Sequence, residues 1–97
     1  MMSEREVYIE KMAAKLKEWD AKIEKLEAKA RNAQADVKKE YDEQIREMKT
    51  QREKVQNKIH KLRESGDDAW DELKAGLEKS WKTLGDTFDR VFKRLKQ

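Results

Sequence analysis

Apolar residues recur along the first two thirds of the chain at alternating spacings of three and four. From Ile9 to Val37 they occupy the a and d positions of about four heptads, the pattern of a helix that packs against another helix. The pattern steps by four and four through Tyr41 and Ile45, and then continues to Leu62. At about 100° per residue, all these positions lie in one sector about 120° wide. The pattern therefore predicts one helical stripe over residues 9–62.

Local signals place the ends of the predicted helices. Ser3 followed by Glu6 is a capping box, which predicts a helix that begins at the N-terminus. The strong break is the segment 65–68, where Gly66 suits the left-handed position that often ends a helix. Beyond it, the apolar residues from Trp70 to Leu95 lie within about 100° of arc. We therefore expect a long helix over about 3–64 and a shorter one over about 67–95.

The second helix is expected to fold back antiparallel onto the end of the first. Turning the chain at Gly66 brings the two stripes together in one register, with Arg52 opposite Trp81, where the guanidinium could stack on the ring. The fold predicted is all-α, an antiparallel helical hairpin or coiled coil. Its pairs are Leu62 with Trp70, Ile59 with Leu73, Val55 with Leu77, Met48 with Leu84, Ile45 with Phe88, Tyr41 with Val91 and Val37 with Leu95.

A second arrangement satisfies the same pattern. Residues 3–30 can fold onto residues 37–64 with a loop over 31–36, which would give a compact three-helix bundle. Asn32 could end the first helix of such a bundle, and Asp36 could cap the next. Residues 31–36 contain no Gly or Pro and keep the stripe in phase, which favours the continuous helix. Both arrangements treat residues 1–97 as a single helical domain.

A continuous first helix would be about 90 Å long at 1.5 Å per residue, and the second helix would cover less than half of it. Residues 37–97 would form the hairpin, and residues 3–36 would keep an exposed coiled-coil seam. An uncovered apolar seam predicts a homo-oligomer or a helical protein partner. The seam residues are Ile9, Met12, Leu16, Trp19, Ile23 and Leu26.

The C-terminal helix also suggests a second function. Its aromatic residues share one face, and its end is rich in Lys and Arg, as in helices that lie on a membrane surface. Reversible membrane-surface binding is therefore the alternative to partner binding, with the acidic start of the helix weakening attraction to anionic lipid. The residues of this face are Trp70, Trp81, Phe88 and Phe92.

Composition narrows the chemistry. Charged residues make up 46% of the chain and hydrophobic ones 36%, with 24 basic against 21 acidic side chains, as in long solvated helices rather than in nucleic-acid-binding surfaces. There is no cysteine and one histidine, so neither a thiolate site nor a pair of histidines for zinc can form. We expect no catalytic residue, cofactor, metal or small-molecule substrate. We also expect no signal peptide, and a cytoplasmic location with the membrane periphery as alternative.

The junction Ser65-Gly66-Asp67-Asp68-Ala69-Trp70 and the segment Leu73-Lys74-Ala75-Gly76 resemble a family of small bacterial coiled-coil proteins. The capped start Ser3-Glu4-Arg5-Glu6 is similar too, and the likeness covers most of the chain. The resemblance implies a bacterial cytoplasmic protein linked to stress responses, and it implies no catalytic residues. The repeated amphipathic pattern is also similar to that of exchangeable apolipoproteins.

Overall fold

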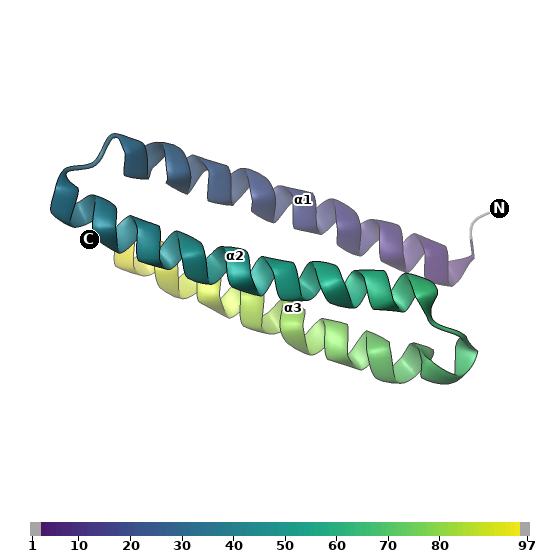
Figure 1. Cartoon of the computed structure of the whole chain (residues 1–97). Helices are drawn as coiled ribbons and strands as arrows, with labels where there is room; N and C mark the ends of the chain where they lie inside the picture. Colours follow the sequence, from purple (N-terminus) through teal and green to yellow (C-terminus); the bar gives the residue numbers. More distant parts are fainter. Residues whose placement is uncertain (1–2, 96–97) are drawn as a thin grey trace.

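The computed structural model describes residues 3–95 and consists of three α-helices joined by two short turns (Figure 1). The helices are α1 (Glu4–Arg31), α2 (Ala35–Glu64) and α3 (Asp67–Leu95). They pack against one another, with neighbours in the sequence running antiparallel, and the molecule measures 51 × 24 × 18 Å along its principal axes. No strand occurs in the described residues, so the expectation of an all-α fold is confirmed.

Helix α1 begins where the capping signal predicts. The hydroxyl of Ser3 accepts a hydrogen bond from the backbone N–H of Glu6 at 3.1 Å, which satisfies one of the N–H groups that lack a partner in the first turn. Glu4 and Glu6 lie in that turn, and Lys29 and Arg31 lie in the last one. Both placements suit the helix dipole, positive at its start and negative at its end.

The structure differs from the expectation of one continuous helix over residues 3–64. Helix α1 ends at Arg31, and residues 32–34 turn the chain so that α2 begins at Ala35. Asn32 ends α1 with φ −98° and ψ 0°, and its side-chain amide donates to the carbonyl of Ala28 at 3.3 Å. Turning here lets α1 bury its own stripe against the rest of the chain, which outweighs the helix-forming preference of an Ala-rich segment.

The turn between α2 and α3 lies where predicted, but Gly66 does not adopt the left-handed conformation. No glycine in residues 3–95 has a positive φ. The chain instead leaves α2 through Ser65, which is extended at φ −72° and ψ 148°. The hydroxyl of Ser65 donates to the carbonyl of Leu62 at 2.7 Å, and its own carbonyl accepts from Arg5 at 2.8 Å. Side-chain hydrogen bonds thus replace the expected glycine cap.

The core lies along α2, where both α1 and α3 contribute to it. Six core residues of α2 and α3 are the most completely enclosed: Met48, Val55, Leu62, Leu77, Leu84 and Val91 are each 0% exposed. Ion pairs join Arg90 to Glu47 and Arg94 to Glu40, in the antiparallel sense predicted for this hairpin. Helix α3 therefore folds back onto α2 in approximately the expected register.

The predicted stripe of residues 9–62 is less buried around residues 33–37 than on either side of them. Val37 is 47% exposed, although the sequence pattern predicts that it pairs with Leu95. The side chain of Leu95 lies outside the described part of the chain. Ala33, in the turn, is only partly buried. The burial of the apolar stripe is thus interrupted between α1 and α2.

Candidate interaction surfaces

The predicted partner seam of α1 lies inside the molecule rather than on its surface. Five of its residues belong to the core, and Trp19 packs against that core while partly exposed. The structure thus differs from the uncovered seam that a continuous helix would leave, because the turn at 32–34 folds α1 back along α2. The exposed fractions are 9% for Ile9, 6% for Met12, 5% for Leu16, 4% for Ile23 and 2% for Leu26.

The predicted membrane face of α3 is covered by the same helix. The ring of Trp19 lies 4.2 Å from that of Phe88 and 6.2 Å from that of Trp81, between centroids. Tyr8 meets Trp70 edge to face at 5.9 Å. Phe92 stacks on Phe88 at 5.9 Å. The two surfaces predicted from the sequence therefore meet at Trp19 of the seam, which packs on Trp81 and Phe88 of the predicted membrane face.

This interface is bridged by side chains alone. No Cα atom of α1 comes within 8 Å of one in α3, whereas α2 approaches both helices that closely. Large aromatic rings fill the wider separation, and such edge-to-face pairs contribute roughly 0.5–1.5 kcal/mol beyond the area they bury. Lys15 adds to the interface, its ammonium lying 6.0 Å from the centre of the Trp81 ring. Helix α1 is thus held directly by α2 and through aromatic side chains by α3.

Arg5 joins the start of α1 to the turn between α2 and α3. Its guanidinium lies 4.5 Å from the centre of the Trp70 ring and donates to the carboxylate of Asp67 at 2.7 Å. It also donates to the carbonyl of Ser65, near the negative end of α2. One planar cation therefore contacts all three helical segments at this end of the molecule, a role that suits arginine better than lysine.

Tyr8 and Glu78 form a second link between α1 and α3. The Tyr8 hydroxyl donates a hydrogen bond to Oε1 of Glu78 at 3.2 Å. Burial, the negative charge of Glu78 and this hydrogen bond together raise the pKa of Tyr8 to about 12 from its ordinary 10.0. All three disfavour the phenolate, so the interface prefers the protonated ring.

This raised pKa predicts that the interface weakens in alkali. The folded chain keeps the Tyr8 proton where the unfolded chain releases it, so this contribution to stability is complete below pH 10 and is lost as the pH rises through about 12. We expect the stability advantage of the wild type over a Tyr8→Phe variant to fall by at most about 1 kcal/mol over that range, because solvent screens the pair. Urea unfolding at several pH values measures it. A Tyr41→Phe variant serves as control, and an advantage that does not fall would contradict the coupling to Glu78.

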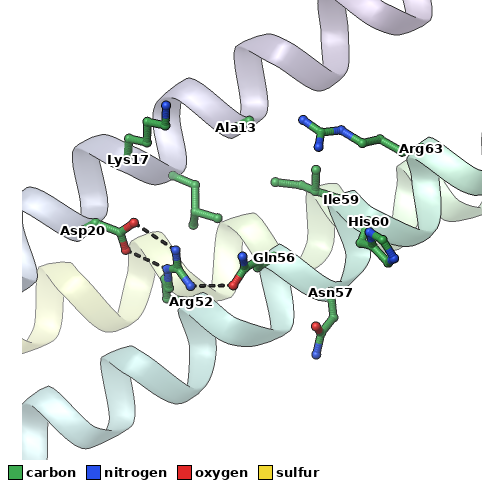
Figure 2. Close-up of a pocket in the computed structure, with 10 residues that line it drawn as sticks. Ala13, Lys17, Asp20, Arg52, Gln56, Asn57, Ile59, His60 and Arg63 are labelled. Atoms are coloured by element: carbon green, nitrogen blue, oxygen red, sulfur yellow. Dashed lines mark hydrogen bonds and ion pairs between the residues drawn. The ribbon is translucent and has the colours of Figure 1, made fainter.

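A polar groove of about 520 Å³ runs between α1 and α2. Figure 2 shows Asp20 of α1 joined across it to Arg52 of α2, and Arg52 joined in turn to Gln56. The Arg52 guanidinium donates twice to the Asp20 carboxylate, at 2.6 and 2.9 Å. The expected stacking of Arg52 on Trp81 is therefore wrong, since Arg52 turns to α1 while Trp81 meets Trp19 and Lys15.

The polar residues that line this groove are exposed, apart from the paired Asp20 and Arg52. His60 lies at its edge, exposed, and pairs with Glu64 one turn away at 3.1 Å. Among residues 3–95, no group of three or more His, Cys, Asp or Glu side chains is placed to hold a metal ion. No side-chain nitrogen or oxygen buried in that part of the chain lacks a hydrogen-bond partner. The features that mark the groove are the Asp20–Arg52 pair and its open, charged walls.

Three contacts at these surfaces are not evident in the sequence pattern. The pairs of Asp20 with Arg52, Tyr8 with Glu78 and Arg5 with Asp67 each join residues far apart in the chain. The sequence holds a signal for the first of them, because Arg52 stands where the three-and-four spacing calls for an apolar residue. A charged residue at a core-facing position needs an opposite charge within reach, and folding α1 onto α2 provides Asp20.

Comparison with models of protein families, with curated proteins and with solved structures finds no match to this chain. Residues 3–95 contain no helix with an apolar stretch long enough to cross a bilayer.

Proposed function

We propose that this chain is a non-catalytic interaction protein that binds through the α1 seam, defined by Ile9, Met12, Leu16, Trp19, Ile23 and Leu26. In this proposal the compact three-helix arrangement is the resting form. Binding follows when α1 separates from the α2–α3 hairpin and presents its seam. A link to bacterial stress is supported by the resemblance of the Ser65–Leu77 segment alone.

The observation that carries the proposal is the difference in packing between the helices. Every core residue of α1 keeps some exposure, from 2% to 9%, whereas six core residues of α2 and α3 are at 0%, with Ile45 and Ile59 of α2 at 6% and 5%. Contacts that bury less apolar surface contribute less stabilisation, so separating them costs less free energy. This difference supports α1 as the helix that separates from the core most readily.

Two ion pairs of α1 point the same way. Lys49 is 55% exposed where it pairs with the half-buried Glu27, and Asp67 is 95% exposed where it meets Arg5. Exposed ion pairs of this kind contribute about 0–1 kcal/mol each. They orient α1 without holding it tightly, which supports a helix that can leave and return.

The spacing of the α1 seam favours a helical partner. Its residues alternate by three and four, which matches the knobs-into-holes packing of one helix on another. Membrane-surface binding through Trp70, Trp81, Phe88 and Phe92 is the second candidate, because the same separation of α1 uncovers that face. The basic residues that would face lipid are partly neutralised, since Arg90 and Arg94 pair with Glu47 and Glu40. Flotation with anionic vesicles distinguishes the two.

Native-state hydrogen exchange tests the proposal. We expect the amides of α1 to exchange through an opening in which α2 and α3 stay protected, with an opening free energy at least about 1.4 kcal/mol below that of the hairpin, equivalent to tenfold faster exchange. Resolution by NMR, residue by residue, compares Leu16 and Ile23 with Val55 and Leu84. Equal protection in all three helices would overturn the proposal, because α1 would then separate only when the whole chain unfolds.

A further inference from the structure

The turn between α1 and α2 identifies the partner of the α1 seam. We propose that a second copy of this chain occupies it. Residues 32–34 straighten, α1 and α2 become one helix, and each chain places its α1 on the α2–α3 hairpin of the other. This inference rests on the proposed release of α1, and it names what the released seam binds.

At Gln34 the turn becomes helical mainly through one backbone rotation. Gln34 already has a helical φ of −66°, so its main change is a rotation of ψ from 157° to about −42°. The Gln34 side chain makes no capping hydrogen bond. No residue from 3 to 95 has a positive φ that a straight helix would have to remove. Local hydrogen bonds maintain the closed turn. They come from the Asn32 side-chain amide and from the backbone N–H groups of Asn32 and Ala33, each of which bonds to a carbonyl three residues earlier.

The register between α1 and α2 is the register of a symmetric pair of straight helices. The Asp20–Arg52 pair has its midpoint in the sequence at residue 36, and the Glu27–Lys49 pair has its midpoint at residue 38. In two antiparallel copies of one helix, the twofold axis passes where a residue meets itself. An axis near residues 36–38 therefore re-forms both ion pairs between the two chains.

The straight form also buries what the closed form leaves exposed. Val37 lies at this axis, is 47% exposed in the closed chain, and would face Val37 of the second copy. Ala33 continues the same stripe and is only partly buried now. The apolar positions from Ile9 to Leu62 stay within about 120° of arc when the helix is continuous. The stripe therefore runs through the turn without a break in phase, as a two-chain arrangement requires.

The α1–α3 contacts involve the same residues when α1 packs on the hairpin of the second copy. Each α3 stays on its own α2, and α1 arrives from the second copy at the place it occupies in the closed chain. Trp19 would then meet Trp81 and Phe88 of the second copy, with the same rings that it meets now. Since the contacts are equivalent, protein concentration and the conformation of residues 32–34 decide between monomer and dimer.

An Ala35→Pro substitution tests the inference by separating the two forms. Ala35 is the first residue of α2, a position that accepts proline, and Gln34 before it has the extended ψ that precedes proline. In a continuous helix the same proline lies in the interior, where it lowers the helix equilibrium by about a hundredfold. The dimer contains two continuous helices and therefore two such prolines, which together lower the dimerisation constant by about ten-thousandfold. An Ala35→Ser variant keeps the N–H group and is the matched control.

The measurement is small-angle scattering with absolute mass, after refolding at low and at high concentration. For the wild type and Ala35→Ser we expect a dimer at high concentration with a maximum dimension near 90 Å, from about 60 helical residues at 1.5 Å each. We expect Ala35→Pro to stay a monomer close to the 51 Å length of the closed chain. A wild-type dimer no longer than the monomer would overturn the inference. So would an Ala35→Pro variant that dimerises as readily as Ala35→Ser.

Failure of the inference and failure of the proposed function give different results. A wild-type chain that stays monomeric, while α1 still exchanges faster than α2 and α3, overturns the exchange of α1 between copies and leaves its release intact. Uniform protection of all three helices overturns the release itself. The hydrogen-exchange and scattering measurements therefore judge the two proposals separately.

Discussion

Replacing Phe88 by alanine is expected to lower the free energy of unfolding by about 3–5 kcal/mol, the range for truncating a buried phenylalanine. The side chain is 1% exposed. Its ring contacts Trp19 of α1 at 4.2 Å and Phe92 of α3 at 5.9 Å, between centroids. The substitution thus leaves a cavity where the aromatic interface joins the core. In a domain of this size, the loss corresponds to a fall in Tm of about 12 °C or more.

Thermal and urea unfolding followed by circular dichroism measure the loss at Phe88. A Val7→Ala variant is the matched control, because Val7 is 51% exposed and its truncation should change stability by no more than about 0.5 kcal/mol. A loss below about 1 kcal/mol in Phe88→Ala would contradict the burial of this ring between α1 and α3.

The sequence pattern was sufficient for the hairpin of α2 and α3. A single glycine-containing break places the turn, and the shorter stripe of residues 70–95 then meets the second half of the longer one in one antiparallel register. That register agrees with the 0% exposure of Val55, Leu77 and Leu84, and with the Arg94–Glu40 ion pair. This pairing can be predicted from the sequence because α2 and α3 follow each other in the chain and run antiparallel.

The turn at residues 32–34 was not predicted in preference to a continuous helix, for a physical reason. Asn32, Ala33 and Gln34 differ in helix propensity by only about 0.7 kcal/mol or less, so no residue among them forces a turn. The apolar stripe keeps its phase through the turn, and the α1–α2 register is centred close to it. The closed chain and the straight helix thus bury the same seam, and periodicity cannot separate two arrangements that use identical contacts.

This equivalence also explains why the candidate surfaces were predicted separately. A stripe shows that a face is buried, but it does not show against which element. The seam with Trp19 and the face with Trp81 and Phe88 were read as two surfaces for two partners, whereas the structure brings them together. Only the three-dimensional arrangement shows that releasing α1 uncovers both at once.

Introducing a carboxylate at Leu26 is expected to release α1 while the hairpin of α2 and α3 persists. Leu26 is 2% exposed, the most enclosed large side chain of the α1 seam. A Leu26→Asp substitution places an unpaired charge in the core, at a cost of about 4 kcal/mol or more unless the helix separates. Since α1 has 28 helical residues against 30 and 29 in α2 and α3, its loss removes about a third of the helical signal.

Circular dichroism and NMR together measure that release. Resonances of Val55 and Leu84 should stay dispersed, because these side chains belong to α2 and α3 and are each 0% exposed. An Ala21→Asp variant carries the same new charge at an exposed site on α1, and it should keep the full helical signal. Loss of all helical structure in Leu26→Asp would show that the hairpin depends on α1, and it would contradict a separable α1. A releasable α1 predicts a partial loss of the helical signal, confined to α1. The hairpin of α2 and α3 must stay folded after α1 has separated from it.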